Sequence, residues 1–464
     1  MSITYSRKER VRRPCATRPS IGWWLLAAGM LAPVAMPARA AAQEHMRLGE
    51  LYETARRSNP GVAAARARTD AARSRVSSAR LPADPELELA FMNRELPGLA
   101  PMPGTGMTQL TVMQMLPVAG QLGLKGRIAR SQVTAAAERA GEAEWEVRAA
   151  VAMAFYDLYA ADRQIAVTRE SLRLLDDIRQ TAESMYRVGQ GRQADVLRAQ
   201  VQIAREAEDT LRMVAMRDAM AARIEALLGE PGADGADDHD PLRIRSPILP
   251  LFPQSIPPLD SLHQRALAGR RMLKAGEAEV AAGATSLRLA KREIWPDLRI
   301  GVAYAQGPAL APMDEPSRNQ RMGSLMLGAS VPIFARGRQL AMREEAAAME
   351  RMALFDLADM RADTRARVAA AHADLERARR LQQLYRSTVL PQAGATVQSS
   401  LSAYRVGSVD FMTLLDNQML VTNYRRDLVM LEAEEGKAWA ELEMLLSDEL
   451  LDPDSTATRS PGGV

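Results

Sequence analysis

The chain has 464 residues, of which 47% are hydrophobic and 25% charged, and 60 basic against 57 acidic residues give a net charge of +3. This composition excludes a disordered chain, and the absence of a basic block beyond the first forty residues argues against a nucleic-acid partner. Aromatic residues make up only 4%, whereas the helix formers Ala, Leu, Arg, Glu, Gln and Met abound. We therefore expect a mainly helical protein.

The first 42 residues have the pattern of a secretory signal peptide. Six basic residues precede the apolar run 21–35, and Ala38-Arg39-Ala40 offers a small-residue cleavage site. A membrane anchor is the alternative, but the run is short for a membrane span and contains Pro33. No later segment resembles a transmembrane helix, although a secreted chain could still enter a membrane through β-strands.

The only cysteine, Cys15, lies in this leader, so the mature chain would contain no thiol. Disulfides, thiolate nucleophiles and cysteine metal sites are therefore excluded. Because Cys15 precedes the apolar run, it cannot be a lipoprotein cysteine.

The chain repeats itself, because Tyr186-Arg187-Val188-Gly189 recurs as Tyr404-Arg405-Val406-Gly407. Other landmarks recur in the same order: Leu197 with Leu415, Gln200 with Gln418, Pro85 with Pro296, and Leu116-Pro117 with Val331-Pro332. We predict a first repeat over 43–229 and a second over 259–447. Each would contain a helix, two strands, and a hairpin of long helices. A connector rich in proline and acidic residues (230–258) joins them, and a flexible tail (448–464) follows.

Four strands are predicted, at about 86–93, 108–116, 297–305 and 323–331. Apolar and polar or small residues alternate in them, as in the run from Leu298 to Tyr304. Alternation over about nine residues is typical of a tilted membrane strand, but also of an ordinary half-buried sheet in a soluble domain. The alternation alone leaves both interpretations open.

The helical hairpins are predicted over 121–229 and 337–447. Apolar residues in the first follow a heptad spacing typical of coiled coils: Val147, Val151, Ala154, Leu158, Ala161 and Ile165. A helix from Gln121 to Val188 would be about 100 Å long. Pro391 should kink its counterpart in the second repeat, where the first has Arg173, so the hairpins should differ in shape.

Long helices attached to short strand pairs cannot make a compact globule. Unpaired strand edges cannot face lipid, so membrane strands must close into a barrel. Four strands are too few, since membrane barrels begin at about eight. Several chains must therefore combine their strands in one barrel. Two chains would give eight strands and three would give twelve, and the strand number alone does not decide between them.

At this point the sequence resembles the TolC family of outer-membrane efflux proteins. The resemblance rests on the duplicated plan, on Tyr-x-Val-Gly at each hairpin tip, on 404–411 running into Leu414-Leu415-Asp416, and on Pro117 and Pro332. It implies a mainly α protein with a membrane β-barrel, in which a homotrimer forms one barrel of twelve strands, four from each chain, and a periplasmic α-barrel. It also implies outer-membrane lipid around the barrel, and docking to a periplasmic adaptor protein and an inner-membrane pump.

Within this family, some motifs resemble the resistance-nodulation-division branch that serves heavy-metal pumps of the cobalt–zinc–cadmium and copper type. They are Asp84-Pro85-Glu86, Phe91-Met92-Asn93, Leu116-Pro117 with Gly120, Leu122-Gly123, Arg127, and Leu390-Pro391-Gln392-Ala393. Copper-type members are often lipidated, and this sequence lacks the cysteine for that. The resemblance implies a passive export duct for small solutes, with heavy-metal cations ahead of drugs and of type I protein secretion.

The resemblance places the gate at the periplasmic hairpin tips, where acids narrow the entrance and a tyrosine helps to hold it shut. The candidate gate residues are Asp195, Asp410, Asp416, Tyr404 and Tyr186. Asp195 and Asp416 are interpreted as matching positions, and Thr413 stands where a second acid would be expected. Alternatively, the acids are helix caps, with Asp195 in a first helical turn, and the tyrosines only pack.

The tip turns should also meet the adaptor, and their candidate docking residues are Arg187, Val188, Gly189, Arg405, Val406 and Gly407. The two glycines are turn residues that tolerate positive φ. Trp295 and Phe334 flank strands and would either anchor the chain at the membrane interface or simply pack.

No enzyme, cofactor or metal site is predicted. The four histidines are scattered, and the 26 methionines include no tight triplet at ligand spacing and are interpreted as gap fillers. No nucleophile–base pair or phosphate loop is found, which argues against a secreted enzyme. The remaining alternative is a periplasmic adaptor, although adaptors usually carry one hairpin rather than two.

Overall fold

A computed structural model describes residues 46–454, except 96, 99, 103–104, 230–245, 309–318, 332 and 335–336. The predicted leader, Pro332, residues 230–245 of the predicted connector and residues 455–464 of the predicted tail lie outside this range. The described residues belong to one compact unit.

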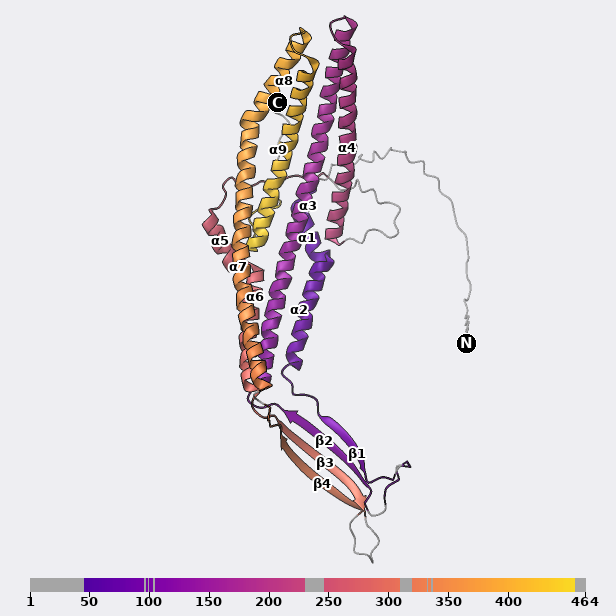
Figure 1. The fold of residues 1–464 in the computed structure, drawn as a ribbon, viewed down its shortest axis with the longest axis vertical. Helices are drawn as coiled ribbons and strands as arrows, with labels where there is room; N and C mark the ends of the chain where they lie inside the picture. Colours follow the sequence, from indigo (N-terminus) through magenta and orange to yellow (C-terminus); the bar gives the residue numbers. More distant parts are fainter. Residues whose placement is uncertain are drawn as a thin grey trace, which may run out of the picture. The chain divides into compact units, whose positions relative to one another are not determined.

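The two repeats contain the same series of elements (Figure 1). The first consists of α1 (Leu48–Ser58), α2 (Pro60–Ser78), β1 (Glu86–Met92), β2 (Met107–Leu116), α3 (Gln121–Arg187) and α4 (Gln193–Leu228). The second consists of α5 (Leu259–Gly269), α6 (Arg271–Arg292), β3 (Leu298–Pro308), β4 (Asn319–Ala329), α7 (Gln339–Leu384), the π-helical turn η2 (Tyr385–Val389), α8 (Leu390–Arg405) and α9 (Phe411–Leu446). The predicted fold class, mainly helical with duplicated hairpins and four strands, is confirmed.

The single helix predicted before each strand pair is two helices. In the first repeat, Asn59 ends α1 in an extended conformation, and its side-chain oxygen accepts hydrogen bonds from the amides of Gly61 (2.8 Å) and Val62 (3.2 Å). Pro60 then occupies the first position of α2, where its missing N–H costs nothing. Arg270 makes the corresponding break between α5 and α6.

Helix α3 is the element on which the other layers pack. Its 67 residues contact α1, α2, α4, α6 and α9, and at about 1.5 Å per residue it is about 100 Å long. Five of the six residues of the predicted heptad seam are buried, namely Val151, Ala154, Leu158, Ala161 and Ile165, and Val147 is partly buried against the same core. Phe155 and Tyr156 beside the seam are fully buried and pack against α1, α4 and α9. None of the described helices carries an apolar stretch long enough to cross a membrane.

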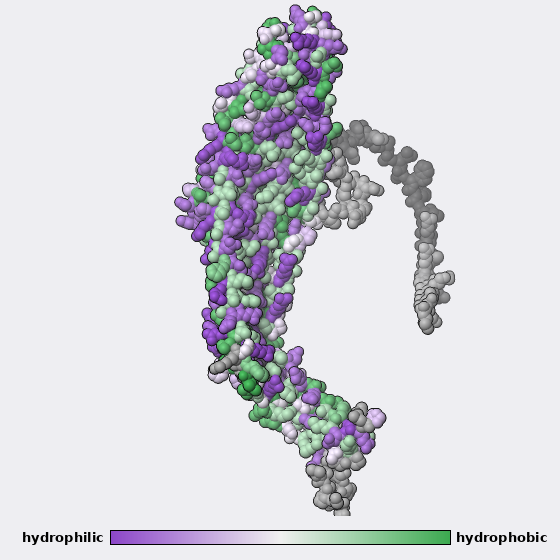
Figure 2. All heavy atoms as spheres, viewed as in Figure 1, coloured by the Kyte–Doolittle hydropathy of each residue, from purple (hydrophilic) through white to green (hydrophobic). Residues whose placement is uncertain are grey.

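The four strands form one antiparallel sheet in the order β1-β2-β3-β4. The register aligns Leu87, Val112, Val302 and Leu325 in one row, so that all four lie on the same face. This face is solvent-exposed, and hydrophobic residues gather over the strands in Figure 2, whereas hydrophilic residues are spread over the helices. The opposite face carries Glu86 and Glu88. The predicted alternation of the strands is therefore confirmed.

The predicted irregularity at Pro391 takes the form of a π-helical turn. Proline removes one backbone donor and its ring conflicts with the carbonyl four residues earlier, here that of Ser387. Ser387 lies inside η2, where the wider turn relieves the conflict. Figure 1 shows α8 leaving the direction of α7 after this turn, whereas α3 continues without interruption through the equivalent Arg173.

The second half of the connector is held against the helices. Met46 pairs with this segment through the Ile248 amide (3.4 Å), and Phe252 packs on the buried core. The Arg379 guanidinium donates to the carbonyl oxygens of Pro253 and Gln254.

The prediction of a flexible tail from residue 448 is wrong for its first residues. The Glu443 carboxylate accepts hydrogen bonds from the backbone amides of Leu450 and Leu451, both at 2.8 Å. Leu451 is buried in the core formed by α3, α5, α7 and α9. The buried Leu451 side chain and the Glu443 carboxylate together hold this segment, which its polar composition had predicted to be mobile.

Gly436 and Gly394 offer a matched test of the packing between α9 and α3. A Cβ at Gly436 would overlap the ring of the fully buried Tyr156, whereas a Cβ at Gly394 would meet nothing within 4 Å. We expect Gly436→Ala to destabilise the protein by about 1–3 kcal/mol through overpacking. Gly394→Ala should stabilise it by about 0.5–1 kcal/mol. Melting temperatures of the purified protein in detergent measure both, and equal shifts would contradict the packing described here.

Candidate functional site

Each helical hairpin turns through a short loop at its tip. In the first, Gly189 adopts φ +75°, and the amides of Gln190 and Gly191 both donate to the Met185 carbonyl at 2.9 Å. In the second, Gly407 adopts φ +72°, and the Ser408 amide donates to the Ala403 carbonyl at 3.0 Å. Both turns close the end of a helix through a residue in the left-handed region, as the recurring Tyr-x-Val-Gly motif predicts.

The residues predicted for docking face solvent. Val188 is 67% exposed and Val406 79% exposed, and among the described residues neither belongs to the core cluster near the tips. Arg187 and Arg405 are exposed beside them, and Arg187 pairs with Glu183. Each tip therefore presents one apolar and one basic side chain next to a glycine.

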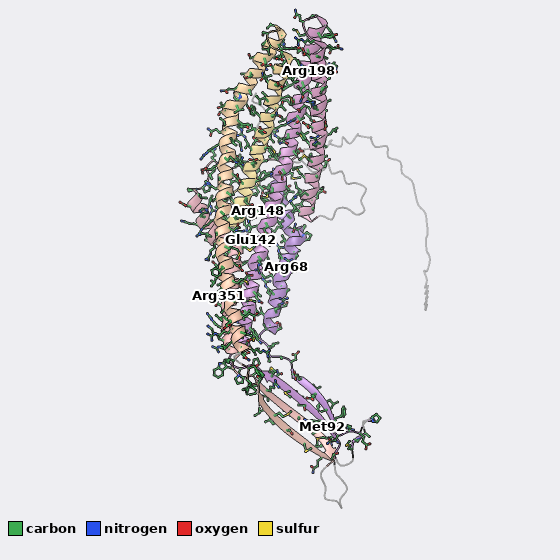
Figure 3. All side chains as sticks on the ribbon, viewed as in Figure 1. Arg68, Met92, Glu142, Arg148, Arg198 and Arg351 are labelled. Carbon is green, nitrogen blue, oxygen red and sulfur yellow. The ribbon has the colours of Figure 1, made fainter. Side chains whose placement is uncertain are left out.

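The interpretation of Asp195 and Asp416 as matching positions is wrong. Helix α4 begins at Gln193 and α9 at Phe411, so Asp195 is equivalent to Thr413, and Asp416 is equivalent to Arg198 (labelled in Figure 3). The two tyrosine motifs and the starts of the two helices are separated by the same number of residues. Asp195 and Asp416 are separated by a different number, so they are not equivalent.

The three acids have different environments. Asp410 is the N-cap of α9, and its Oδ1 accepts from the Thr413 amide (3.3 Å) and the Thr413 hydroxyl. The hydrogen bond from the Thr413 side chain lowers the pKa of Asp410. Asp416 is exposed, whereas Asp195 is buried in the first turn of α4. The helix-cap alternative therefore describes Asp410, which is the cap residue itself, and Asp195 lies in a first helical turn as that alternative states.

The two motif tyrosines differ in burial. Tyr404 is 5% exposed, and its ring contacts that of Phe411 at 5.7 Å with an interplanar angle of 65°. Tyr186 is 47% exposed at the equivalent position. Burial raises the pKa of Tyr404, and the neighbouring Asp195 carboxylate raises it further. The structure thus brings Tyr404 and Asp195 together from two different hairpins.

This contact belongs to a core that joins the hairpins near their tips, which we call the tip core. Its buried members are Leu175, Ile178, Ala182, Ala199, Tyr404, Phe411, Leu414 and Leu415. A hydrogen bond between Ser171 and Thr422 (3.0 Å) and an ion pair between Glu206 and Arg426 (2.5 Å) extend the junction along α3, α4 and α9.

Sequence reasoning missed Phe411 as a member of this core. Phe411 opens a helix directly after a turn, where an apolar residue indicates packing. It also missed that Leu415 is buried although its counterpart Leu197 is exposed.

The described residues contain no group of three or more His, Cys, Asp or Glu side chains that could hold a metal ion. Of the histidines, His263 and His372 lie on α5 and α7, and His45 and His239 lie outside the described residues. Trp295 and Phe334 are both exposed where helices meet strands.

Comparison with known families gives one match. Residues 51–230 and 262–447 match the family described as "Outer membrane efflux protein". No curated protein sequence matches the chain significantly.

Solved structures show the same fold. The outer-membrane channel OprN is 21% identical, with a TM-score of 0.72 over 87% of this chain and 90% of that chain. CusC is 17% identical, with a TM-score of 0.70 over 88% and 93% of the two chains. VceC from Vibrio cholerae is 18% identical, with a TM-score of 0.69 over 86% and 96%.

Gly407 permits a direct test of the tip geometry. A Cβ at this position would meet nothing within 4 Å, so the cost of Gly407→Ala is that of the left-handed backbone, about 1–2 kcal/mol. Gly407→Asn should restore much of the loss, because asparagine tolerates this conformation. Amide hydrogen exchange over 404–411 measures the local effect. Equal exchange in both variants would contradict a conformational cause.

Proposed function

The chain belongs to the outer membrane efflux protein family, and from this premise we propose that three copies form a passive export duct for heavy-metal cations. Members of the family are outer-membrane channels of tripartite efflux systems that extend into the periplasm, and they are transport proteins rather than enzymes. The family match over both repeats sets aside the alternative of a periplasmic adaptor.

The sheet supports the pooling of strands between chains. Within the described residues, β1 pairs only with β2, and β4 pairs only with β3, so each chain offers two free edges. Joining β1 of one copy to β4 of the next satisfies both edges, and three copies of a four-stranded sheet give twelve strands. The exposed aliphatic face then meets outer-membrane lipid, and the face with Glu86 and Glu88 lines the lumen. Trp295 and Phe334 would lie near the membrane interface.

The hairpin tips supply the docking surface for an adaptor in this proposal. Val188 and Val406 are the most exposed large apolar groups of the tip turns, and each stands beside an arginine. Such an apolar and basic pair suits a coiled-coil partner with complementary acids. The energy for transport would come from the inner-membrane pump that completes the system.

The gate would combine the tip core with the exposed acids. Tyr404 packs in the tip core that joins the two hairpins, beside the Asp195 carboxylate, so opening would have to loosen this core. Asp410 and Asp416 carry exposed carboxylates near the tip of the second hairpin. In a trimer they would form rings of negative charge that favour cations. Tyr186 is exposed and would contact a neighbouring copy.

Metal cations are favoured as cargo by the motifs at 84–86, 91–93 and 390–393 and by the acids at the tip. A duct for drugs is the alternative, and it would not require acidic rings. Protein secretion comes third.

Purified trimers in planar bilayers should show discrete, cation-selective conductance. Asp410→Asn with Asp416→Asn should lower the ratio of cation to anion permeability, because the rings lose their charge. Asp356→Asn removes an exposed acid from α7, away from the tip, and should leave the ratio unchanged. Well-folded trimers without conductance would overturn the duct.

The cargo is tested by deleting the gene and restoring it on a plasmid. We expect the deletion strain to lose tolerance of heavy-metal salts while keeping its tolerance of apolar drugs. The opposite pattern would indicate drugs rather than metal cations as the cargo, and it would not contradict the proposed export duct.

A further inference from the structure

Methionine is confined to one face of the sheet. The strands carry six methionines, and the register places all of them on the face that bears the glutamates: Met92, Met107, Met113, Met115, Met322 and Met326. The Leu, Ile, Val, Phe and Tyr side chains of the same strands all lie on the opposite face. A methionine placed only for its apolar surface would be expected among the other large apolar residues.

These methionines lie among small and polar residues and not in a helical seam: Met92, Met115 and Met322 are exposed, and Met107, Met113 and Met326 are partly buried. Their neighbours on the same face are glycine, alanine, serine, threonine or polar residues, such as Ala303 and Ser324. Met92, which Figure 3 labels near the end of β1, is 42% exposed. The interpretation of the methionines as gap fillers of helical seams therefore does not apply here, and the thioether group itself needs an explanation.

Two of the methionines converge on one glycine. Met113 on β2 and Met326 on β4 both face Gly301 on β3, which lies between them in the same row. A Cβ built on Gly301 would lie 3.5 Å from Met113 Cγ and 3.5 Å from Met326 Cε. The two side chains thus approach one position from opposite sides, and the glycine keeps that position free.

A second pair lies further along the same face. Met92 and Met107 are direct partners on β1 and β2. Directly opposite residues have Cβ atoms about 5 Å apart, within reach of two thioethers on one ion. Met322 lies on β4 between the rows of the two pairs.

We propose that this face binds soft monovalent metal ions, Cu(I) or Ag(I), with Met113 and Met326 above Gly301 as its first site. Thioethers are soft ligands that select such ions over Zn(II) or Mg(II). The only cysteine lies outside the described residues, so methionine supplies the soft sulfur there. Several weak sites in series suit a duct, since an ion must leave each site as readily as it enters. The lumenal position of the face rests on the proposed function.

The full-length protein, purified in detergent, is titrated with silver nitrate in chloride-free buffer and followed by calorimetry. Met113→Leu with Met326→Leu removes both thioethers at nearly constant volume. We expect the first binding event to weaken by more than about 100-fold, beyond the 10–100-fold range for loss of a group that only supports ligands. The control is Met349→Leu with Met352→Leu on α7, where both methionines are more than half exposed, and it should bind as the parent does.

Gly301→Ala keeps every thioether and fills the open position. It should weaken the first site by about tenfold, while Met92 and Met107 still bind. Unchanged silver binding in the double leucine variant would overturn the proposal, as would equal losses in the control. Melting temperatures show whether the double leucine variant is folded. If it is not, the silver affinity of Gly301→Ala tests the proposal instead.

Bilayer conductance separates this proposal from the duct. The leucine variant should conduct as the parent does while its silver binding is lost. If the parent protein binds silver at Met113 and Met326 but shows no conductance, the proposed metal site is supported and the proposed export duct is contradicted.

Discussion

The long apolar seam of α3 is the constraint on which the other helices depend. Most of the stability of a helix in a protein comes from the packing of its apolar face, so the seam of this 67-residue helix must be covered by other helices. The chain covers it in sections: α4 packs along one part, α2 along another, and α6 and α9 join the two repeats to it. The core is therefore narrow and very long, and residues such as Tyr156 and Gly436 fit one another because no second layer could compensate for a gap.

Sequence predicted the parts of this arrangement that depend on periodicity. The heptad of α3 predicted which side chains are buried, and the alternation of the strands predicted which side chains share a face, but not that the apolar face is exposed. The break at Asn59-Pro60 was missed, although a cap residue before proline is a local signal. The fold of 448–451 could not be predicted, because it depends on the burial of Leu451 among residues of α3, α5 and α7 that are far away in the sequence.

At the hairpin tips, the sequence repeat predicts the backbone turns but not the surroundings of the side chains. The two motifs give equivalent turns, and Gly189 and Gly407 adopt nearly the same φ. The motif tyrosines nevertheless have different environments, because Tyr404 enters a core shared with the other hairpin. Pairing across hairpins, as between Tyr404 and Asp195, is tertiary information that neither copy of the motif contains. The methionines of the sheet are a second example, because only the strand register brings Met113 and Met326 to the two sides of Gly301.

The π-helical turn η2 has a consequence for symmetry. The first and second long helices begin at Gln121 and Gln339 and reach their tyrosines at the same offset, so neither contains an inserted residue. A π turn holds more residues per turn than an α turn, and the residues that follow it are therefore rotated about the helix axis relative to their counterparts in α3. Tyr186 is exposed and Tyr404 is buried, so the equivalent positions after the long helices differ in environment. In the proposed trimer, six copies of one motif would alternate between two orientations around the mouth. Such a ring has threefold but not sixfold symmetry, so the two kinds of hairpin would present different side chains to the mouth.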